Sequence, residues 1–223
     1  MESEILSFQG ISQRKAVRKI EHLPSKRIFD VMFSLVILLL FSPVFAAIAL
    51  AIRLSTGEGA MYVQLRLGRG GRVFKCYKFR TMYHDADRRL PELLEQNPHL
   101  RQEWATHQKL QDDPRVFPVG KWLRRTSLDE LPQFWNVMKG DLSVVGPRPY
   151  MVYQKRQMGA HASTILSVRP GITGLWQTSG RSRTSFAQRI ALDAAYVARR
   201  SFWLDLKLIL KTIPQVFFST DAC

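Results

Sequence analysis

The chain is poor in cysteine, with only Cys76 and Cys223 among its 223 residues. Two cysteines do not form the disulfide framework of a small secreted domain, so we expect a reducing, cytoplasmic setting for the soluble part. The five histidines are scattered, and no pair has the spacing of metal ligands, so we expect no zinc site. Internal repeats and low-complexity segments are also missing, and the length fits one catalytic domain with shorter appendages.

Acidic residues are scarce relative to basic ones. The sequence has 18 Asp and Glu against 33 Lys and Arg, which gives a net charge of +15. This excess predicts anionic partners: nucleic acid, anionic lipid headgroups or phosphorylated small molecules. Because the sequence has no helix-turn-helix, zinc-finger or aromatic RNA-binding motif, we expect no nucleic acid as partner. A basic, membrane-anchored nucleic-acid-binding protein is kept as a distant alternative.

One long segment lacks charge altogether. The 22 residues from Val31 to Ile52 contain no charged side chain. A helix of this length rises roughly 1.5 Å per residue and would just cross a hydrocarbon core of about 30 Å. The segment starts too late in the chain for a simple cleaved signal peptide. It therefore predicts an attachment to a membrane.

Two features of this segment argue against a simple span. Lys and Arg are frequent on both sides of it, although positive charge normally marks only the cytoplasmic flank. Ser42 and Pro43 lie at its midpoint, and Pro43 cannot donate a hydrogen bond to the carbonyl of Leu39. The Ser42 hydroxyl can bond a backbone group freed by the proline, which lipid cannot do. We expect a helix–break–helix that enters the membrane and returns to the same face, with a kinked transmembrane anchor as the alternative.

The segment after the membrane region reads as a β-hairpin. Residues 61–67 and 72–79 flank a glycine-rich turn at 68–71, as expected for two antiparallel strands. No GxxxxGK[ST] pattern follows, which favours a turn over a phosphate-binding loop. Lys78 and Arg80 then stand at the end of the second strand beside a hydroxyl. They are candidates for substrate phosphate, although Lys is also common on solvated edge strands.

Helices are expected in the central part of the chain, over residues 84–110 and again from Leu128. Residues 84–110 look helical, with Pro91 and Pro98 at first-turn positions. A helix from Leu128 to about Lys139 is expected to end at Gly140. Its first turn holds two adjacent carboxylates, Asp129 and Glu130. Arg124 and Arg125 precede this turn, and Arg148 follows it. A carboxylate nucleophile surrounded by such cations suits an anionic substrate.

The two carboxylates also have a purely structural interpretation. Ser127 and Glu130 fit a capping box, in which Glu130 bonds the Ser127 amide. Asp129 would then be an ordinary acid in the first turn, favoured by the helix dipole. The surrounding basic residues and the rigid Pro147-Arg148-Pro149 that follows a short apolar strand favour catalysis.

The C-terminal third combines a turn-rich loop with two helices. Residues 168–181 are rich in glycine and proline with cations between them, which suits either close approach to a nucleotide or an ordinary connection. An amphipathic helix is expected over 184–199. The pattern of residues 202–218 fits a helix lying in the lipid interface and, nearly as well, a terminal helix packed on the core.

In order along the chain, these motifs resemble the bacterial sugar transferase family, the monotopic phosphoglycosyl transferases. The resemblance covers about residues 24–218. It rests on Lys-Arg-x-x-Asp at 26–30, Ser-Pro at 42–43, Lys-Phe-Arg-Thr-Met at 78–82, Asp-Glu at 129–130, Pro-Arg-Pro at 147–149 and Arg-Pro-Gly-Ile-Thr-Gly-Leu-Trp-Gln at 169–177. Each motif alone is weak, but this many in order is specific. Residues 109–116 make members that transfer galactosyl phosphate in exopolysaccharide synthesis look most similar.

The resemblance implies transfer of a sugar 1-phosphate, with galactose favoured over glucose or an N-acetylated sugar, from a UDP-sugar to undecaprenyl phosphate, releasing UMP. Asp129 would form an aspartyl-phosphosugar, and Glu130 would act as a base or a metal contact. Mg²⁺ is expected as cofactor, with Asp87 as a weaker second ligand. The implied substrate-binding residues are Lys26, Arg27, Lys78, Arg80, Arg148, Gln177 and Arg181.

The expected fold is α+β and mainly α. It comprises a basic segment (1–25), a re-entrant membrane helix (26–53) and a catalytic domain (54–223) in which interfacial helices and a small β-hairpin surround the active site. The implied location is the bacterial inner membrane, monotopic and in contact with its lipids, with the active site facing the cytoplasm. The sequence leaves open whether the chain forms a homo-oligomer, and it offers no role for residues 1–23.

Overall fold

The computed structural model describes residues 24–107, 110–179 and 184–218. Its architecture is mainly helical with two small sheets, and the α+β prediction is confirmed. In chain order the elements are α3 Pro24–Leu40, α4 Ser42–Thr56, β1 Met61–Leu67, η1 Arg69–Gly71, β2 Val73–Phe79, α5 Ala86–Gln96, α6 Pro98–His107, α7 Pro118–Arg125, η2 Leu128–Glu130, α8 Gln133–Lys139, β3 Ser143–Val145, η3 Val152–His161, α9 Ala162–Ile165, β4 Gly171–Thr173, α10 Phe186–Arg199 and α11 Phe202–Phe218.

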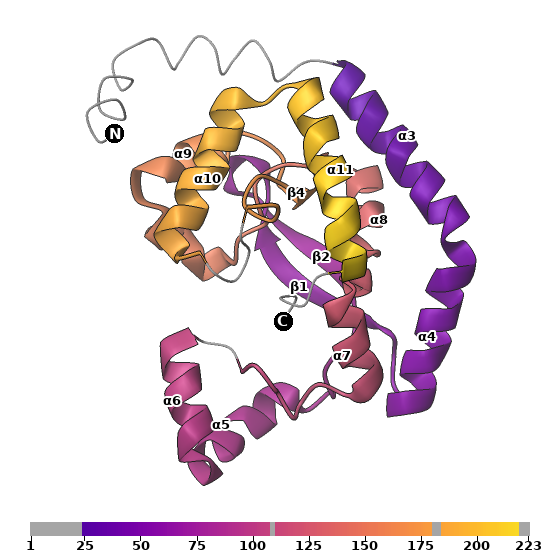
Figure 1. The fold of residues 1–223 in the computed structure, drawn as a ribbon, viewed down its shortest axis with the longest axis vertical. Helices are drawn as coiled ribbons and strands as arrows, with labels where there is room; N and C mark the ends of the chain where they lie inside the picture. The colour runs from indigo at the N-terminus through magenta and orange to yellow at the C-terminus, as the bar shows by residue number, and fades with distance from the viewer. Residues whose placement is uncertain (1–23, 108–109, 180–183, 219–223) are drawn as a thin grey trace.

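The apolar segment forms two helices that meet at an angle. Figure 1 shows α3 and α4 as a bent rod along one side of the molecule, and the bend between them is 60°. The Ser42 hydroxyl donates to the Leu39 carbonyl at 2.8 Å, the group that Pro43 leaves without a donor. Among the described residues no single helix is long and apolar enough to cross a membrane, but this bent pair together passes that test by length and composition. The predicted break is therefore confirmed.

Much of the surface of α3, α4 and α11 is apolar. α3 packs on α8 with one side, while large apolar side chains on its other side stay exposed. The exposed residues of the three helices include Met32, Val36, Leu39, Leu40, Leu50, Leu54, Phe202, Trp203, Leu210 and Ile213. A soluble monomer rarely exposes so large an apolar surface, which is typical of contact with lipid or a partner. The opposite face of α11 is buried at Asp205 and Leu208, so this helix has one core face and one exposed face.

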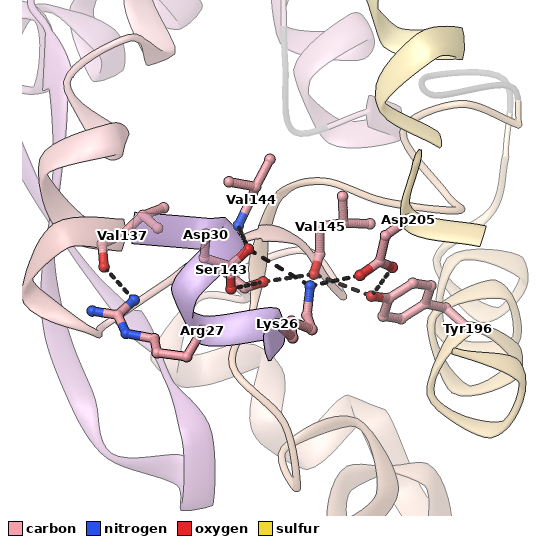
Figure 2. Close-up of polar contacts among 9 residues, drawn as sticks. All are labelled: Lys26, Arg27, Asp30, Val137, Ser143, Val144, Val145, Tyr196 and Asp205. Carbon is pink, nitrogen blue, oxygen red and sulfur yellow. Dashed lines mark hydrogen bonds and ion pairs between the residues drawn. The ribbon is translucent and has the colours of Figure 1, made fainter. Parts of the chain in front are cut away.

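A polar network ties the start of α3 to the C-terminal helices (Figure 2). Lys26 donates to Asp205 of α11 at 2.6 Å, and Asp205 also accepts from the Tyr196 hydroxyl at 2.7 Å. Asp30, which is 2% exposed, accepts from the Ser143 hydroxyl and from the Val144 amide at the start of β3. Each buried polar group therefore has a partner from a distant part of the chain, which fixes α3 against the core.

The two sheets hold the centre of the domain. β1 and β2 form the predicted antiparallel hairpin, with Met61 opposite Phe79 and Leu67 opposite Val73. β3 and β4 pair in parallel, a pairing between loops that the sequence analysis did not predict. A Cβ on Gly171 would lie 2.0 Å from the Gly146 nitrogen, so glycine is required for this close approach of backbones. The loop at 168–181 is thus partly a buried strand.

Within the described part of the chain, three clusters of buried side chains form the core. One joins β3, α8, α10 and α11 around Val137, Leu142, Val144 and Tyr196. A second joins α4 to the hairpin end and α7 around Ile52, Phe79, Phe117 and Leu123. A third packs Leu67, Tyr150, Met158, Ile165 and Ile190 together.

Several predicted helix boundaries need correction. Pro98 begins α6 as predicted, but Pro91 lies inside α5 and not in its first turn. Pro91 is exposed, so its missing N–H leaves a carbonyl that water can reach. α10 begins at Phe186, two residues later than predicted, because Ser185 and Gln188 form a capping box there. α11 has the predicted bounds, and Gly140 ends α8 in the left-handed conformation.

The network in Figure 2 predicts an unequal response to removal of two carboxylates. Asp205→Ala removes the acceptor at 2.6 Å from the Lys26 ammonium and the acceptor at 2.7 Å from the buried Tyr196 hydroxyl. Lys26 then has only the Asp30 carboxylate at 3.7 Å and Tyr196 only the Val145 carbonyl at 3.1 Å, so the free energy of unfolding should fall by about 1–3 kcal/mol. Asp112→Ala removes an exposed ion pair with Lys121 and should cost less than about 1 kcal/mol. Thermal unfolding of both variants in the same detergent measures the difference. Equal shifts would contradict the importance of the network.

The bend at Pro43 predicts a hairpin-like topology. Single cysteines at positions 13 and 96, in a chain lacking Cys76 and Cys223, should both resist a membrane-impermeant thiol reagent in intact spheroplasts. Both should react after permeabilisation. Pro43→Leu restores the missing donor and makes a straight span competitive, so part of the position-13 cysteine should then be labelled from outside. Labelling of that cysteine without the Pro43 change would show a full span.

Candidate active site

Asp129 and Glu130 lie in a tight turn between α7 and α8. The carboxylates occupy the 3₁₀ turn η2, and the regular helix begins only at Gln133. The predicted continuous helix from Leu128 is therefore wrong at its start. Pro132 explains the difference, because it has no N–H to donate to the carbonyl four residues earlier.

The structural interpretation of this turn as a capping box is also wrong. The Ser127 side chain makes no capping hydrogen bond, and its backbone has a φ of 55°. A residue other than glycine rarely adopts this left-handed conformation, which is not that of an N-cap residue. The Glu130 carboxylate turns instead toward Lys78. The turn thus directs both acidic side chains to the hairpin and not to a helix end.

Lys78 of β2 lies against both carboxylates. Its ammonium donates to Glu130 Oε1 at 2.6 Å and lies 3.5 Å from Asp129 Oδ2. The next hydroxyl of the same segment, Thr81, accepts from Arg124 Nε at 2.9 Å, which joins the end of the hairpin to α7. Two acids and a lysine therefore form one cluster built from β2 and η2, in which Asp129 is buried and Lys78 and Glu130 are half-buried.

The three charges shift one another's acidity. Burial raises the pKa of Asp129, and the negative charge of Glu130 adds to this effect against the opposing charge of Lys78. Burial also favours the neutral form of Glu130, but Lys78 and Arg148 outweigh it and lower the pKa of Glu130 to about 2. Glu130 is thus always ionised near neutral pH, whereas Asp129 is the more basic carboxylate of the two. A more basic carboxylate is the better nucleophile.

A narrow cavity opens beside Glu130. Its volume is about 10 Å³, space for roughly one water molecule, so a substrate must displace side chains to enter. The lining residues are Arg66, Cys76, Lys78, Glu130, Gln133, Arg148, Pro149, Ile172 and Gln177. The structure thus brings Lys78, Arg148 and Gln177, predicted from three separate motifs, to the carboxylates.

Arg148 is held by contacts on both its backbone and its side chain. Its amide donates to Asp193 Oδ2 at 3.2 Å, and the same oxygen accepts from the Tyr150 hydroxyl at 2.7 Å. The Arg148 guanidinium lies 5.0 Å from the ring centre of Trp176, a cation–π distance. The paired strands β3 and β4 carry Arg148 and Trp176 to this position.

Some predicted substrate-binding residues lie elsewhere. Arg80 donates to the Gly59 carbonyl at 2.9 Å and so holds the turn before β1. Arg27 donates to the Val137 and Met138 carbonyls at the end of α8, and Lys26 belongs to the network with Asp205. Arg181 lies outside the described residues. For these four residues a role in substrate binding stays a prediction.

Sequence reasoning missed three lining residues, Arg66, Cys76 and Gln133. The hairpin register gives a signal for the first two. Gln64 lies opposite Cys76, and Tyr62 lies opposite Lys78, so Arg66, two residues after Gln64, shares their face of the hairpin. Tracing this face outward from Lys78 would have predicted Arg66 and Cys76.

The described residues contain no group of three or more His, Cys, Asp or Glu side chains arranged to hold a metal ion. The pair Asp129 and Glu130 still fits Mg²⁺, which is commonly bound by one or two carboxylates together with the phosphates of a substrate. Asp87 is exposed in the first turn of α5, and its role as a ligand stays a prediction.

The chain is similar to known proteins over most of its length. A model of the bacterial sugar transferase family matches residues 21–219. The exopolysaccharide production protein ExoY of Rhizobium meliloti (strain 1021) is 47% identical over 198 residues, which cover 89% of this chain and 88% of that protein. An undecaprenyl-phosphate galactose phosphotransferase of Salmonella typhimurium is 41% identical over 86% of this chain but only 40% of its own length. A UDP-glucose:undecaprenyl-phosphate glucose-1-phosphate transferase of Escherichia coli is 38% identical over 88% of this chain and 41% of its own length.

Proposed function

This chain belongs to the bacterial sugar transferase family, and from this premise we propose that it transfers a sugar 1-phosphate from a UDP-sugar to undecaprenyl phosphate with release of UMP. The observation that carries the proposal is the buried Asp129 beside Glu130, with one lysine against both. Galactose is the proposed sugar, since similar proteins are named for galactose transfer. Glucose is the alternative, because other relatives are named for glucose, and an N-acetylated sugar follows. We propose that the reaction is the first membrane step of exopolysaccharide synthesis, since two relatives are named for exopolysaccharide production.

The proposed first step is an attack by an Asp129 carboxylate oxygen on the sugar-bearing phosphorus. The bond from this phosphorus to the oxygen of the neighbouring phosphate breaks, and UMP leaves with the electron pair. The chain then carries an aspartyl-phosphosugar, which divides one difficult transfer into two easier ones. The raised pKa of Asp129, caused first by burial, supports its role as nucleophile. Lys78 lies where it can balance negative charge during the attack.

In the second step a phosphate oxygen of undecaprenyl phosphate attacks the same phosphorus. The bond to Asp129 breaks, the carboxylate is restored, and the product is an undecaprenyl diphosphate sugar. With a pKa of about 2, Glu130 is a weak base, so we favour a role in charge balance and metal contact over proton abstraction. Mg²⁺, when bound by Glu130 and Asp129 with the substrate phosphates, would neutralise the charge of the diphosphate.

The membrane helices give this reaction its location. Undecaprenyl phosphate keeps its tail in hydrocarbon, whereas a UDP-sugar stays in water, so the nucleophile must lie at the level of the headgroups. The bent pair α3 and α4 and the exposed apolar face of α11 support a monotopic attachment to the inner membrane with the active site facing the cytoplasm.

UMP release from a panel of UDP-sugars, with and without undecaprenyl phosphate, tests the proposal. The wild type should release UMP continuously only with the acceptor, and fastest with UDP-galactose. Asp129→Asn should reduce turnover at least 1,000-fold, on the order of the loss of other essential catalytic groups, while the chain stays folded and membrane-bound. Substantial UMP release by Asp129→Asn would reject Asp129 as nucleophile.

The charges around Asp129 predict opposite pH effects for two variants. Only ionised Asp129 can attack, so kcat/KM should rise with pH through the pKa of Asp129. Lys78 lowers this pKa and Glu130 raises it. In the residual activity, the acid limb should therefore move to higher pH in Lys78→Met and to lower pH in Glu130→Gln. Lys121→Met, which changes an exposed lysine, serves as control and should leave the limb in place. Shifts in the same direction for Lys78 and Glu130 variants would contradict this charge arrangement.

A further inference from the structure

Arg66 is a buried cation that faces the cavity without a carboxylate partner. Its side chain comes from β1, and the residue is 9% exposed. The guanidinium makes three hydrogen bonds, all to neutral oxygens. Nη1 donates to the Pro149 carbonyl at 2.9 Å, and Nε and Nη2 donate to Gln64 Oε1. Because a guanidinium has five N–H groups, two have no acceptor among the described residues.

A buried charge is normally paired with an opposite charge, since burial without one is costly. Within the described part of the chain, no carboxylate lies within ion-pair distance of Arg66 or of the neighbouring Arg148. Burial and the positive charge of Arg148 lower the pKa of Arg66 to about 10. The negative charge of Glu130 opposes this shift only in part, so an anion placed between Arg66 and Arg148 would stabilise the charged form of Arg66.

The cations near the carboxylates divide into two sides. Burial dominates the environment of Asp129, and the cations acting on it are Lys78 and Arg124. Burial also comes first for Glu130, where the cations are Lys78, Arg148 and Arg66. Lys78 is shared, Arg124 belongs to the Asp129 side, and the two remaining arginines belong to the Glu130 side. A diphosphate has two adjacent anionic groups, so one group could lie near the cations of the Asp129 side and the other near those of the Glu130 side.

We propose that Arg66, together with Arg148, binds the phosphate group that stays on the departing UMP. This inference rests on the proposed transfer from a UDP-sugar. The attacked phosphorus must lie next to Asp129, so the neighbouring phosphate falls on the Glu130 side, where the two arginines line the cavity. The planar guanidinium suits bidentate contact with phosphate oxygens, and an arriving phosphate meets two N–H groups that need no partner removed. Gln64 and Pro149 set the plane of the guanidinium before the nucleotide arrives.

The test compares equilibrium binding of radiolabelled UMP and uridine to the full chain in lipid nanodiscs. Uridine lacks the phosphate, so the ratio of the two affinities isolates the phosphate contact. Arg66→Lys keeps the positive charge but loses the planar guanidinium that makes the bidentate contact, so it should weaken UMP binding about tenfold. Arg66→Gln should weaken it about 100-fold, on the scale of one or two charge-assisted hydrogen bonds. Uridine binding should change less than about twofold in both. Arg72→Gln, an exposed arginine of the same hairpin, is the matched control and should bind both as the wild type does.

The outcomes separate this inference from the proposed function. Retained uridine binding shows that a variant is folded, and a selective loss of UMP affinity supports the phosphate contact. An equal loss of UMP and uridine affinity would identify Arg66 as a support for Pro149 only and overturn the inference. Unchanged UMP binding would overturn it as well, while UMP release by the wild type would keep the transfer reaction intact. If the wild type bound UMP through Arg66 yet released none from any UDP-sugar, the proposed function would fail instead.

Discussion

Two adjacent carboxylates share a buried turn in this protein because one lysine lies against both. Without Lys78, Asp129 and Glu130 would repel each other in a site where burial already disfavours their charged forms. Burial favours the neutral form of both carboxylates, but the ammonium lies closer to Glu130 than to Asp129, and Arg148 adds its charge at Glu130. The pKa of Glu130 therefore falls, while that of Asp129 stays raised. Glu130 stays ionised and Asp129 becomes the more basic carboxylate, although the two are neighbouring residues of one turn. Similar separation of paired carboxyl groups underlies acid–base and nucleophilic roles in many enzymes.

The rest of the fold keeps the two sides of this cluster together. The hairpin supplies Lys78 and Arg66, while the turn between α7 and α8 supplies the acids. The close pairing of β3 with β4 brings the Pro-Arg-Pro segment and Trp176 to the same cavity. Contacts of α3 with β3, α8 and α11 connect this centre to the apolar helices. The proposed position of Asp129 relative to a membrane surface would thus be set by these contacts of α3.

The parts of the fold that depend on neighbouring residues could be predicted from the sequence. The hairpin, the break at Ser42 and Pro43, and the end of α8 at Gly140 follow from local rules for turns, proline and glycine. Asp129 and Glu130 were found because they are adjacent and lie among cations. The parts that depend on distant contacts could not be predicted. No local pattern indicates the hydrogen bond of Lys26 to Asp205, 179 residues away, and the expected role of Lys26 in substrate binding stays a prediction. The hairpin register could have predicted the face on which Arg66 lies, but not its hydrogen bond to the Pro149 carbonyl, 83 residues away. Ser127 and Glu130 match a capping box in sequence, whereas in the structure Glu130 accepts from Lys78.

The covalent attachment of a sugar phosphate to Asp129 is the central claim, and mass spectrometry of the intact chain and of its peptides tests it most directly. The chain is incubated with UDP-galactose in the absence of undecaprenyl phosphate, quenched with acid and digested. One sugar phosphate should be attached per chain, on the peptide that contains Asp129, and it should disappear when undecaprenyl phosphate is added before the quench. Stoichiometric UMP release without any adduct, or an adduct on a different residue, would contradict a mechanism through Asp129.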